Sequence, residues 1–188
     1  MNIYETPLPG VLVFEPRVFS DPRGFFLETY HQQRYRAAGI EIDFVQDNHS
    51  YSQQGTLRGL HYQLQHPQGK LVRVVSGEVF DVAVDIRKGS PWFGQWFGER
   101  LSAENKKQLY IPPGFAHGFC VLSETADFLY KCTDFYYPDD DYGVAWNDPD
   151  LAIDWLLEQP TLSSKDEALP KLKDIQEPQL PAYAVAEV

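Results

Sequence analysis

The sequence has few cysteines, a small share of positive charge and no long hydrophobic run. Both cysteines, Cys120 and Cys132, lie in apolar or mixed stretches, so we expect reduced core residues and no disulfide. Lysine and arginine number 16 against 27 aspartates and glutamates, a formal charge of −11. This acidity argues against nonspecific binding to nucleic acid or to an anionic membrane. An anionic small-molecule ligand would need a local cluster of basic side chains.

No apolar run approaches the roughly 20 residues that span a bilayer. The first ten residues, MNIYETPLPG, have neither the basic nor the apolar region of a secretory signal. We therefore expect a cytoplasmic protein that does not associate with membranes. Hydrophobic residues make up 43% of the chain and aromatic residues 14%, which excludes a disordered chain.

Short strand patterns recur along the chain, each bounded by Gly, Pro, Asn or Asp. Strands are predicted at 11–19, 24–30, 42–52, 56–64, 95–101, 108–122, 127–137 and 151–155, with a hairpin at 70–87. Short helices or helical turns are predicted at 31–39, 102–108 and 162–169. This pattern predicts an all-β fold, a sandwich, jelly roll or barrel with a few short helices. The 188 residues suit a single domain, with its β core at about 10–155 and an irregular or helical segment at about 156–188.

The hairpin at 70–87 has Ser76-Gly77-Glu78 as its turn. In its second half one face carries Phe80, Val82, Val84 and Ile86, and the other carries Asp81 and Asp85. Polar residues that face inward in such a fold require an explanation, because a small-molecule site commonly lies in the interior or the mouth.

LRGLHYQ, residues 57–63, reads as a strand with two residues that do not suit apolar packing. Arg58 and His61 are three positions apart, so a regular strand would point them to opposite faces. A bulge at Gly59 would add one residue and bring both side chains to the interior. Alternatively, Arg58 precedes the regular pairing. We predict one of these two arrangements.

IPPGFAHGF, residues 111–119, resembles the second sequence motif of cupins, in which the histidine often binds a metal. A metal site would need further histidines and a glutamate near His61. Gln63 stands where a second histidine is expected, and no glutamate follows at the usual distance. His61 and His117 alone make a poor metal site, so we predict no metal and keep a metal-dependent cupin as an alternative.

Without a metal, His61 is either a hydrogen-bonded core residue or an acid–base group. Arg58, Lys70 and Arg73 surround it in sequence, and Lys70 begins a strand in which Val72 and Val74 share its face. A lysine on an inward face is costly unless it meets an anion or a developing negative charge. An exposed lysine at a strand edge is about equally compatible with the pattern.

Nine segments together resemble one family, the dTDP-4-dehydrorhamnose 3,5-epimerases. They occur in one collinear order between about residues 3 and 170: FVQDNHS, LRGLHYQ, GKLVRVVSGEVFDVAVDIR, FGQW, LSAENK, IPPGFAHGF, FLYKCTDFY, WNDP and LSSKD. The resemblance implies a cupin-type jelly-roll barrel and an epimerase domain over residues 1–188. It also implies inversion of dTDP-4-dehydro-6-deoxy-D-glucose at C3 and C5, without a cofactor.

The resemblance also assigns roles in the chemistry. The C4 ketone acidifies the hydrogens on both neighbouring carbons, so the reaction needs a base, an acid and a group that holds the enolate oxygen. His61 matches the proton acceptor, Asp166 the carboxylate that orients it, Lys70 the group at the enolate oxygen and Tyr130 the proton donor. From spacing alone, Tyr130 would more often be a core residue and Asp166 a solvated acid in the first turn of a helix.

The residues that match substrate-binding positions are Arg23, Glu28, Gln46, Asp47, Asn48, Arg58, Lys70, His117, Tyr136 and Asp141. Arg23 and Arg58 suit a pyrophosphate, and Tyr136 suits stacking on thymine. Asp141 stands where the family often has glutamate, one methylene longer.

The resemblance further implies a homodimer in which N-terminal strands join the neighbouring sheet, and the many aromatic residues at 14–35 suit either such an interface or a core. Three alternatives to the 3,5-epimerase stay open. They are an epimerase of a single carbon acting on a related sugar nucleotide, a metal-dependent cupin and a non-enzymatic sugar-nucleotide-binding module.

Overall fold

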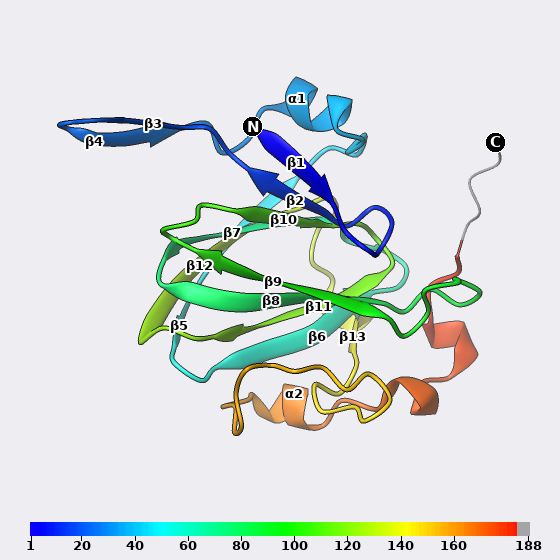
Figure 1. The fold of residues 1–188 in the computed structure, drawn as a ribbon. Coiled ribbons are helices and arrows are strands. Elements are labelled where there is room, and N and C mark those ends of the chain that lie inside the picture. The colour runs from blue at the N-terminus through cyan, green and yellow to red at the C-terminus, as the bar shows by residue number, and fades with distance from the viewer. Residues whose placement is uncertain (184–188) are drawn as a thin grey trace.

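The chain forms two facing antiparallel sheets, as a computed structural model shows for residues 1–183 (Figure 1). The first sheet has the order β1 (Asn2–Glu5), β2 (Leu12–Glu15), β10 (Gln108–Ile111), β7 (Lys70–Ser76), β12 (Thr125–Cys132) and β5 (Gln46–Gln53). The second has the order β13 (Asp141–Gly143), β6 (Leu57–Gln63), β11 (Phe115–Val121), β8 (Glu78–Asp85) and β9 (Trp96–Ser102). The predicted all-β jelly-roll fold is confirmed.

A separate hairpin, β3 (Val18–Asp21) with β4 (Gly24–Leu27), extends away from the two sheets (Figure 1). The prediction of one strand over 11–19 was wrong, because this stretch is divided between β2 in the first sheet and β3 in the hairpin. Pro16 lies at the division, and a proline lacks the N–H that a continuous ladder would use.

The prediction of a hairpin at 70–87 was also wrong. β7 pairs with β10 and β12 in the first sheet, whereas β8 pairs with β11 and β9 in the second. The turn at Gly77 therefore carries the chain from one sheet to the other. A Cβ at Gly77, whose φ is +78°, would lie 2.0 Å from the carbonyl oxygen of Thr125. Alternation in sequence predicts a strand and its two faces, but not the strand's partner.

Three hydrophobic clusters pack the two faces of each sheet. The cluster between the sheets includes Val72, Val74 and Phe128. A second cluster covers the outer face of the five-stranded sheet, where Val82 and Val84 meet the C-terminal segment. A third, which contains Phe14, Tyr35, Ile40, Leu71 and Tyr110, includes the buried residue of helix α1 (Gln32–Ala37). The predicted helix at 31–39 is thus confirmed.

The C-terminal segment is irregular apart from α2 (Ser164–Glu167) and three-residue 3-10 helices at Leu172–Asp174 and Glu177–Gln179; a third such helix, Pro138–Asp140, lies earlier. The strand predicted at 151–155 does not form. Leu151 and Trp155 are buried as the alternation indicated. However, Ala152 and Leu156 have φ values of +47° and +59°, which are incompatible with an extended ladder.

The predicted helical turn at 102–108 is a hydrogen-bonded turn in which the backbone N–H of Asn105 donates to the Ser102 hydroxyl at 3.0 Å. Cys120 and Cys132 are free and buried, as predicted. No helix within residues 1–183 is long and apolar enough to cross a membrane.

Candidate active site

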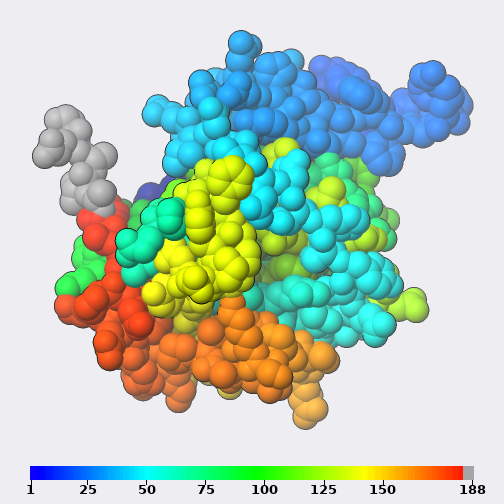
Figure 2. Space-filling view, turned by 180° about the vertical axis from the view of Figure 1, so that it is seen from behind, coloured from blue at the N-terminus to red at the C-terminus, as the bar shows by residue number. Residues whose placement is uncertain are grey.

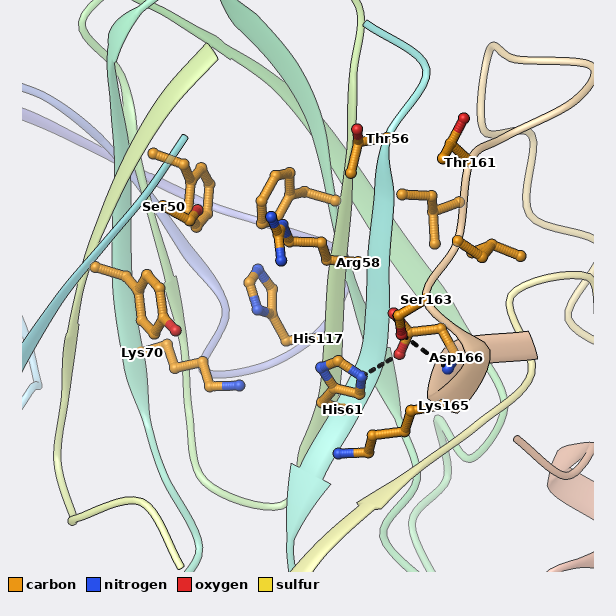
Figure 3. A pocket seen from close by; sticks show the side chains of 15 residues that line it. Ser50, Thr56, Arg58, His61, Lys70, His117, Thr161, Ser163, Lys165 and Asp166 are labelled. Carbon is orange, nitrogen blue, oxygen red and sulfur yellow. Dashed lines mark hydrogen bonds and ion pairs between the residues drawn. The ribbon is translucent and has the colours of Figure 1, made fainter. Parts of the chain in front are cut away.

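A cavity of about 430 Å³ opens between the two sheets and is bordered on one side by α2 (Figure 3). Its lining contains five basic side chains, Arg58, His61, Lys70, His117 and Lys165. The acidic chain therefore has the local basic cluster that an anionic ligand requires. Arg73 is not part of it, because this side chain lines separate smaller cavities of about 200 Å³ and 100 Å³.

Arg58 and His61 both face this cavity because β6 contains a bulge. Arg58 is opposite Phe119 and His61 is opposite His117, so β6 has two residues where β11 has one. Of the two predicted arrangements, the bulge is the one that the structure shows, and both side chains face the cavity.

Gly59 permits the bulge through its conformation and its lack of a side chain. Its φ is +112°, and a Cβ at this position would lie 2.6 Å from the carbonyl oxygen of His117. The same two strands approach each other closely at Gly118, whose Cβ would lie 2.7 Å from the carbonyl oxygen of Arg58. Only glycine fits both positions without displacing a strand.

Asp166 orients His61. Nε2 of His61 lies 2.5 Å from Oδ1 of Asp166, which leaves Nδ1 on the cavity side (Figure 3). Asp166 lies in the first turn of α2, and the hydroxyl of the N-cap residue Ser163 donates to its Oδ2 at 2.9 Å. Burial raises the pKa of Asp166, but the hydrogen bonds and charge of its partners, His61 first, outweigh burial and leave that pKa below its ordinary value.

Lys70 and Tyr130 line the cavity from the opposite sheet, on β7 and β12. Lys70 shares the inward face of Val72 and Val74, which decides between the two interpretations that the sequence left open. Burial lowers the pKa of the Lys70 ammonium, while nearby Cys132, Asp141 and Asp81 act in the other direction. Burial likewise raises the pKa of the Tyr130 phenol, which therefore keeps its proton at neutral pH.

A second lobe of about 250 Å³ adjoins the first, since both are lined by His61, Lys70 and Tyr130. Four residues predicted to bind substrate also line this lobe: Gln46, Asn48, Tyr136 and Asp141. The Tyr136 hydroxyl donates to Oδ2 of Asp141 at 2.8 Å, and the Lys165 ammonium contacts the same oxygen. The ring of Tyr136 is half exposed at the edge of this lobe.

Three other residues that were predicted to bind substrate line neither lobe of the cavity in their own chain. Arg23, at the end of the β3–β4 hairpin, pairs with Asp21. Glu28 pairs with Arg34, and Asp47 with Lys131.

Sequence reasoning missed Asp81 and Lys165, both of which contact predicted site residues. Asp81 could have been found, because it alternates onto the inward face of β8. Lys165 lies within LSSKD beside Asp166 but gave no independent signal. Within residues 1–183, no group of three or more His, Cys, Asp or Glu side chains is arranged to hold a metal ion.

A jelly roll whose basic cavity gathers a histidine bonded to a carboxylate, a lysine and a tyrosine has the fold and the acid–base groups of a cupin-like epimerase. The family model described as dTDP-4-dehydrorhamnose 3,5-epimerase matches residues 5–174. The chain belongs to this family and is an isomerase.

Known relatives extend over almost the whole chain. The dTDP-4-dehydrorhamnose 3,5-epimerase of Pseudomonas aeruginosa is 63% identical over 168 residues, which cover 88% of this chain and 93% of the relative. That of Shigella flexneri is 58% identical with the same coverage. The crystal structure of the dTDP-6-deoxy-D-glucose-3,5-epimerase of Legionella pneumophila, in complex with dTDP-4-keto-L-rhamnose, has a TM-score of 0.96. It is 56% identical and covers 98% of this chain and 99% of its own.

Proposed function

We propose that the protein inverts C3 and C5 of dTDP-4-dehydro-6-deoxy-D-glucose to give dTDP-4-dehydro-L-rhamnose, a step in dTDP-rhamnose formation. The observation that carries this proposal is the cavity's two-sided arrangement. The oriented base His61 lies on one sheet, and Lys70 and Tyr130 lie on the other. A base and an acid on opposite walls suit removal of a proton from one face of a carbon and its return to the other.

His61 removes a hydrogen next to the C4 ketone through Nδ1, and the electrons of the broken C–H bond move to form an enolate. Asp166 fixes the orientation of the ring and stabilises the imidazolium that forms. The Lys70 ammonium stabilises the negative charge on the enolate oxygen. The Tyr130 hydroxyl then donates a proton to the carbon from the opposite side, which completes the inversion.

The sugar nucleotide occupies both lobes of the cavity in this account. Among residues 1–183, the side chain of Arg58 has one hydrogen-bond partner, the Ser52 hydroxyl, which its Nε contacts at 3.1 Å. Its remaining N–H groups are available for the diphosphate. Tyr136 stacks on the thymine, and Gln46 and Asn48 border the same lobe. Asp141 is one methylene shorter than the glutamate common in the family, and Lys165 and Tyr136 converge on it.

We also propose a homodimer assembled through the β3–β4 hairpin. The hairpin exposes Phe19, Phe25 and Phe26, with 51%, 59% and 70% of their surface accessible. Exposed apolar surface of this kind on a projecting element is typical of an interface. In such a dimer Arg23 and Glu28 would reach the cavity of the second copy, which would explain why their own chain leaves them outside its cavity.

Cytoplasmic localisation is likewise a proposal. It is supported by two thiols, Cys120 and Cys132, that are both free and buried, because free thiols are typical of a reducing compartment. Fractionation of the native host, with antibody detection of the full chain, tests this assignment.

Proton NMR of the 4-keto sugar nucleotide in D₂O tests the reaction. The account predicts deuterium from solvent at both C3 and C5, together with the product of double inversion. Deuterium at one of the two carbons alone would favour the single-carbon epimerase, and no incorporation would favour a binding module. A metal-dependent cupin would instead lose its activity after treatment with a chelator.

A further inference from the structure

Asp81 is a buried carboxylate to which the mechanism above gives no role. It lies on β8 with none of its surface accessible. Nε2 of His117, on the neighbouring strand β11, lies 2.9 Å from both carboxylate oxygens of Asp81. Among the residues described, His117 is the hydrogen-bond partner of this carboxylate. Because His117 lines the cavity opposite His61, a second histidine–aspartate pair borders the cavity beside the pair formed by His61 and Asp166.

This contact determines which nitrogen of His117 carries hydrogen. Nε2 lies within hydrogen-bond distance of two carboxylate oxygens, and such oxygens are acceptors, so we assign the hydrogen of this contact to Nε2. Burial lowers the pKa of His117, and Lys70 and His61 add to the effect while Asp81 opposes it. The ring is therefore neutral, and its Nδ1 carries a lone pair.

The His117 ring faces the cavity between Arg58 and His61 (Figure 3). A lone pair at Nδ1 accepts a hydrogen bond and cannot donate one. It cannot bind the diphosphate or the enolate oxygen, which are themselves acceptors. The donors that the sugar ring offers are its hydroxyl groups, on C2 and C3. C3 is inverted during the reaction, whereas the C2 hydroxyl keeps its configuration throughout.

From this geometry we propose that Asp81 is a positioning residue that fixes His117 as an acceptor for the C2 hydroxyl of the sugar. The inference rests on the proposed function, since it concerns the same substrate in the same cavity. It assigns His117 to recognition of a hydroxyl that does not react. This contact holds the sugar ring while C3 and C5, the carbons on either side of the ketone, are inverted. The pair also gives the cavity a means to discriminate against 2-deoxy sugars.

A comparison of two substrates in two proteins tests the proposal. Asp81→Asn keeps the size of the side chain but replaces two charged acceptor oxygens with one neutral oxygen. We expect kcat/KM for the full substrate to fall about tenfold. For the analogue that lacks the C2 hydroxyl, we expect wild type and variant to agree within about twofold. An equal loss on both substrates would overturn the proposal, because it would show a role that does not involve this hydroxyl.

Asp85→Asn is the matched control. Asp85 is a second buried carboxylate on β8, but it binds Arg87 and Ser90 rather than His117. Any effect of this variant should be the same factor for both substrates. A substrate-selective effect in this control would mean that the loss in Asp81→Asn reflects strand β8 in general.

Long-range proton–nitrogen NMR of His117 in the wild-type protein supplies a test that does not depend on how the variants fold. We expect hydrogen on Nε2 and none on Nδ1 at neutral pH, and hydrogen on Nδ1 would overturn the proposal. Failure of the proposed function would look different, since wild type would then exchange no substrate hydrogen with solvent.

Discussion

At the scale of single residues, the site depends on contacts between side chains that are far apart in the chain. His61 and Asp166 are 105 positions apart, and Asp81 and His117 are 36 apart. Spacing alone predicted that Asp166 is a solvated acid in the first turn of a helix. Only the resemblance to a family paired it with His61, and neither pattern nor resemblance identified Asp81. The face of a strand on which a side chain lies can be predicted from its neighbours in sequence, but the hydrogen-bond partner of that side chain depends on the tertiary fold.

The pair formed by His61 and Asp166 should make stability depend on pH. The pKa of Asp166 is lower in the folded protein than in the unfolded chain. The ionised form therefore stabilises the fold above the unfolded value of about 4, and this contribution is lost as the pH falls through the folded value. We expect the difference in unfolding free energy between wild type and Asp166→Asn to be largest above about pH 5 and to shrink below pH 4.

Urea denaturation from pH 3 to pH 7 measures this difference. Glu158→Gln, which removes an exposed carboxylate, is the control and should show a small difference throughout. A difference for Asp166→Asn that does not change with pH would contradict the assigned direction of the pKa shift.

At the scale of elements, turns and breaks determine the fold more than strand patterns do. Strands form in the stretches predicted at 42–52, 56–64, 95–101 and 127–137, but the strand predicted at 108–122 was wrong, because this stretch is divided between β10 in one sheet and β11 in the other. Two local features redirected others, namely Pro16 in the first strand and Gly77 between β7 and β8. The bulge in β6 could be proposed from sequence, because Gly59 lies between Arg58 and His61, two polar residues that a regular strand would point to opposite faces. Strand partners were not predictable, since they depend on which sheet each turn leads to.

Gly59→Ala should disrupt the bulge. The added Cβ combines a positive φ with a contact of 2.6 Å to the backbone of β11. We expect the unfolding free energy to fall by at least about 2 kcal/mol and kcat to fall with it, because Arg58 and His61 lose their common direction.

Gly55→Ala separates the two causes, since Gly55 also has a positive φ, +80°, but a Cβ there would have no neighbour within 4 Å. We expect a smaller loss of stability and unchanged kcat in this control. Equal losses in the two variants would show that strain alone, and not the approach of β11, makes glycine necessary at position 59. Thermal melts and steady-state rates give both quantities.

At the scale of the whole molecule, one chain presents an incomplete set of the residues expected to bind substrate. The two connected lobes of the cavity bring together most of that set. Arg23 instead lies in the turn between β3 and β4, and this hairpin extends away from the two sheets (Figure 1). Viewed from the opposite side, the hairpin and the N-terminal segments project beyond the main body of the protein (Figure 2). The sequence contains many aromatic residues at 14–35, but it could not show which of them are exposed and which belong to the core.

Replacement of the exposed aromatic residues should separate the proposed dimer. We expect Phe25→Ser with Phe26→Ser to give a folded monomer with strongly reduced kcat/KM, because Arg23 would no longer reach a second cavity. Sedimentation velocity measures the assembly. Phe93→Ser, at another exposed aromatic position that is 41% accessible, is the control and should remain dimeric and active. A wild-type monomer, or a fully active double variant, would contradict the proposed assembly.

The central claim is that His61 removes the hydrogens beside the ketone, and solvent exchange measures this step directly. Wild type and His61→Asn are incubated with the 4-keto sugar nucleotide in D₂O, and deuterium at C3 and C5 is followed by proton NMR. The account predicts that exchange at both carbons slows by about 10²- to 10⁴-fold in the variant, while its affinity for dTDP changes little. Exchange in His61→Asn at the wild-type rate would contradict the account.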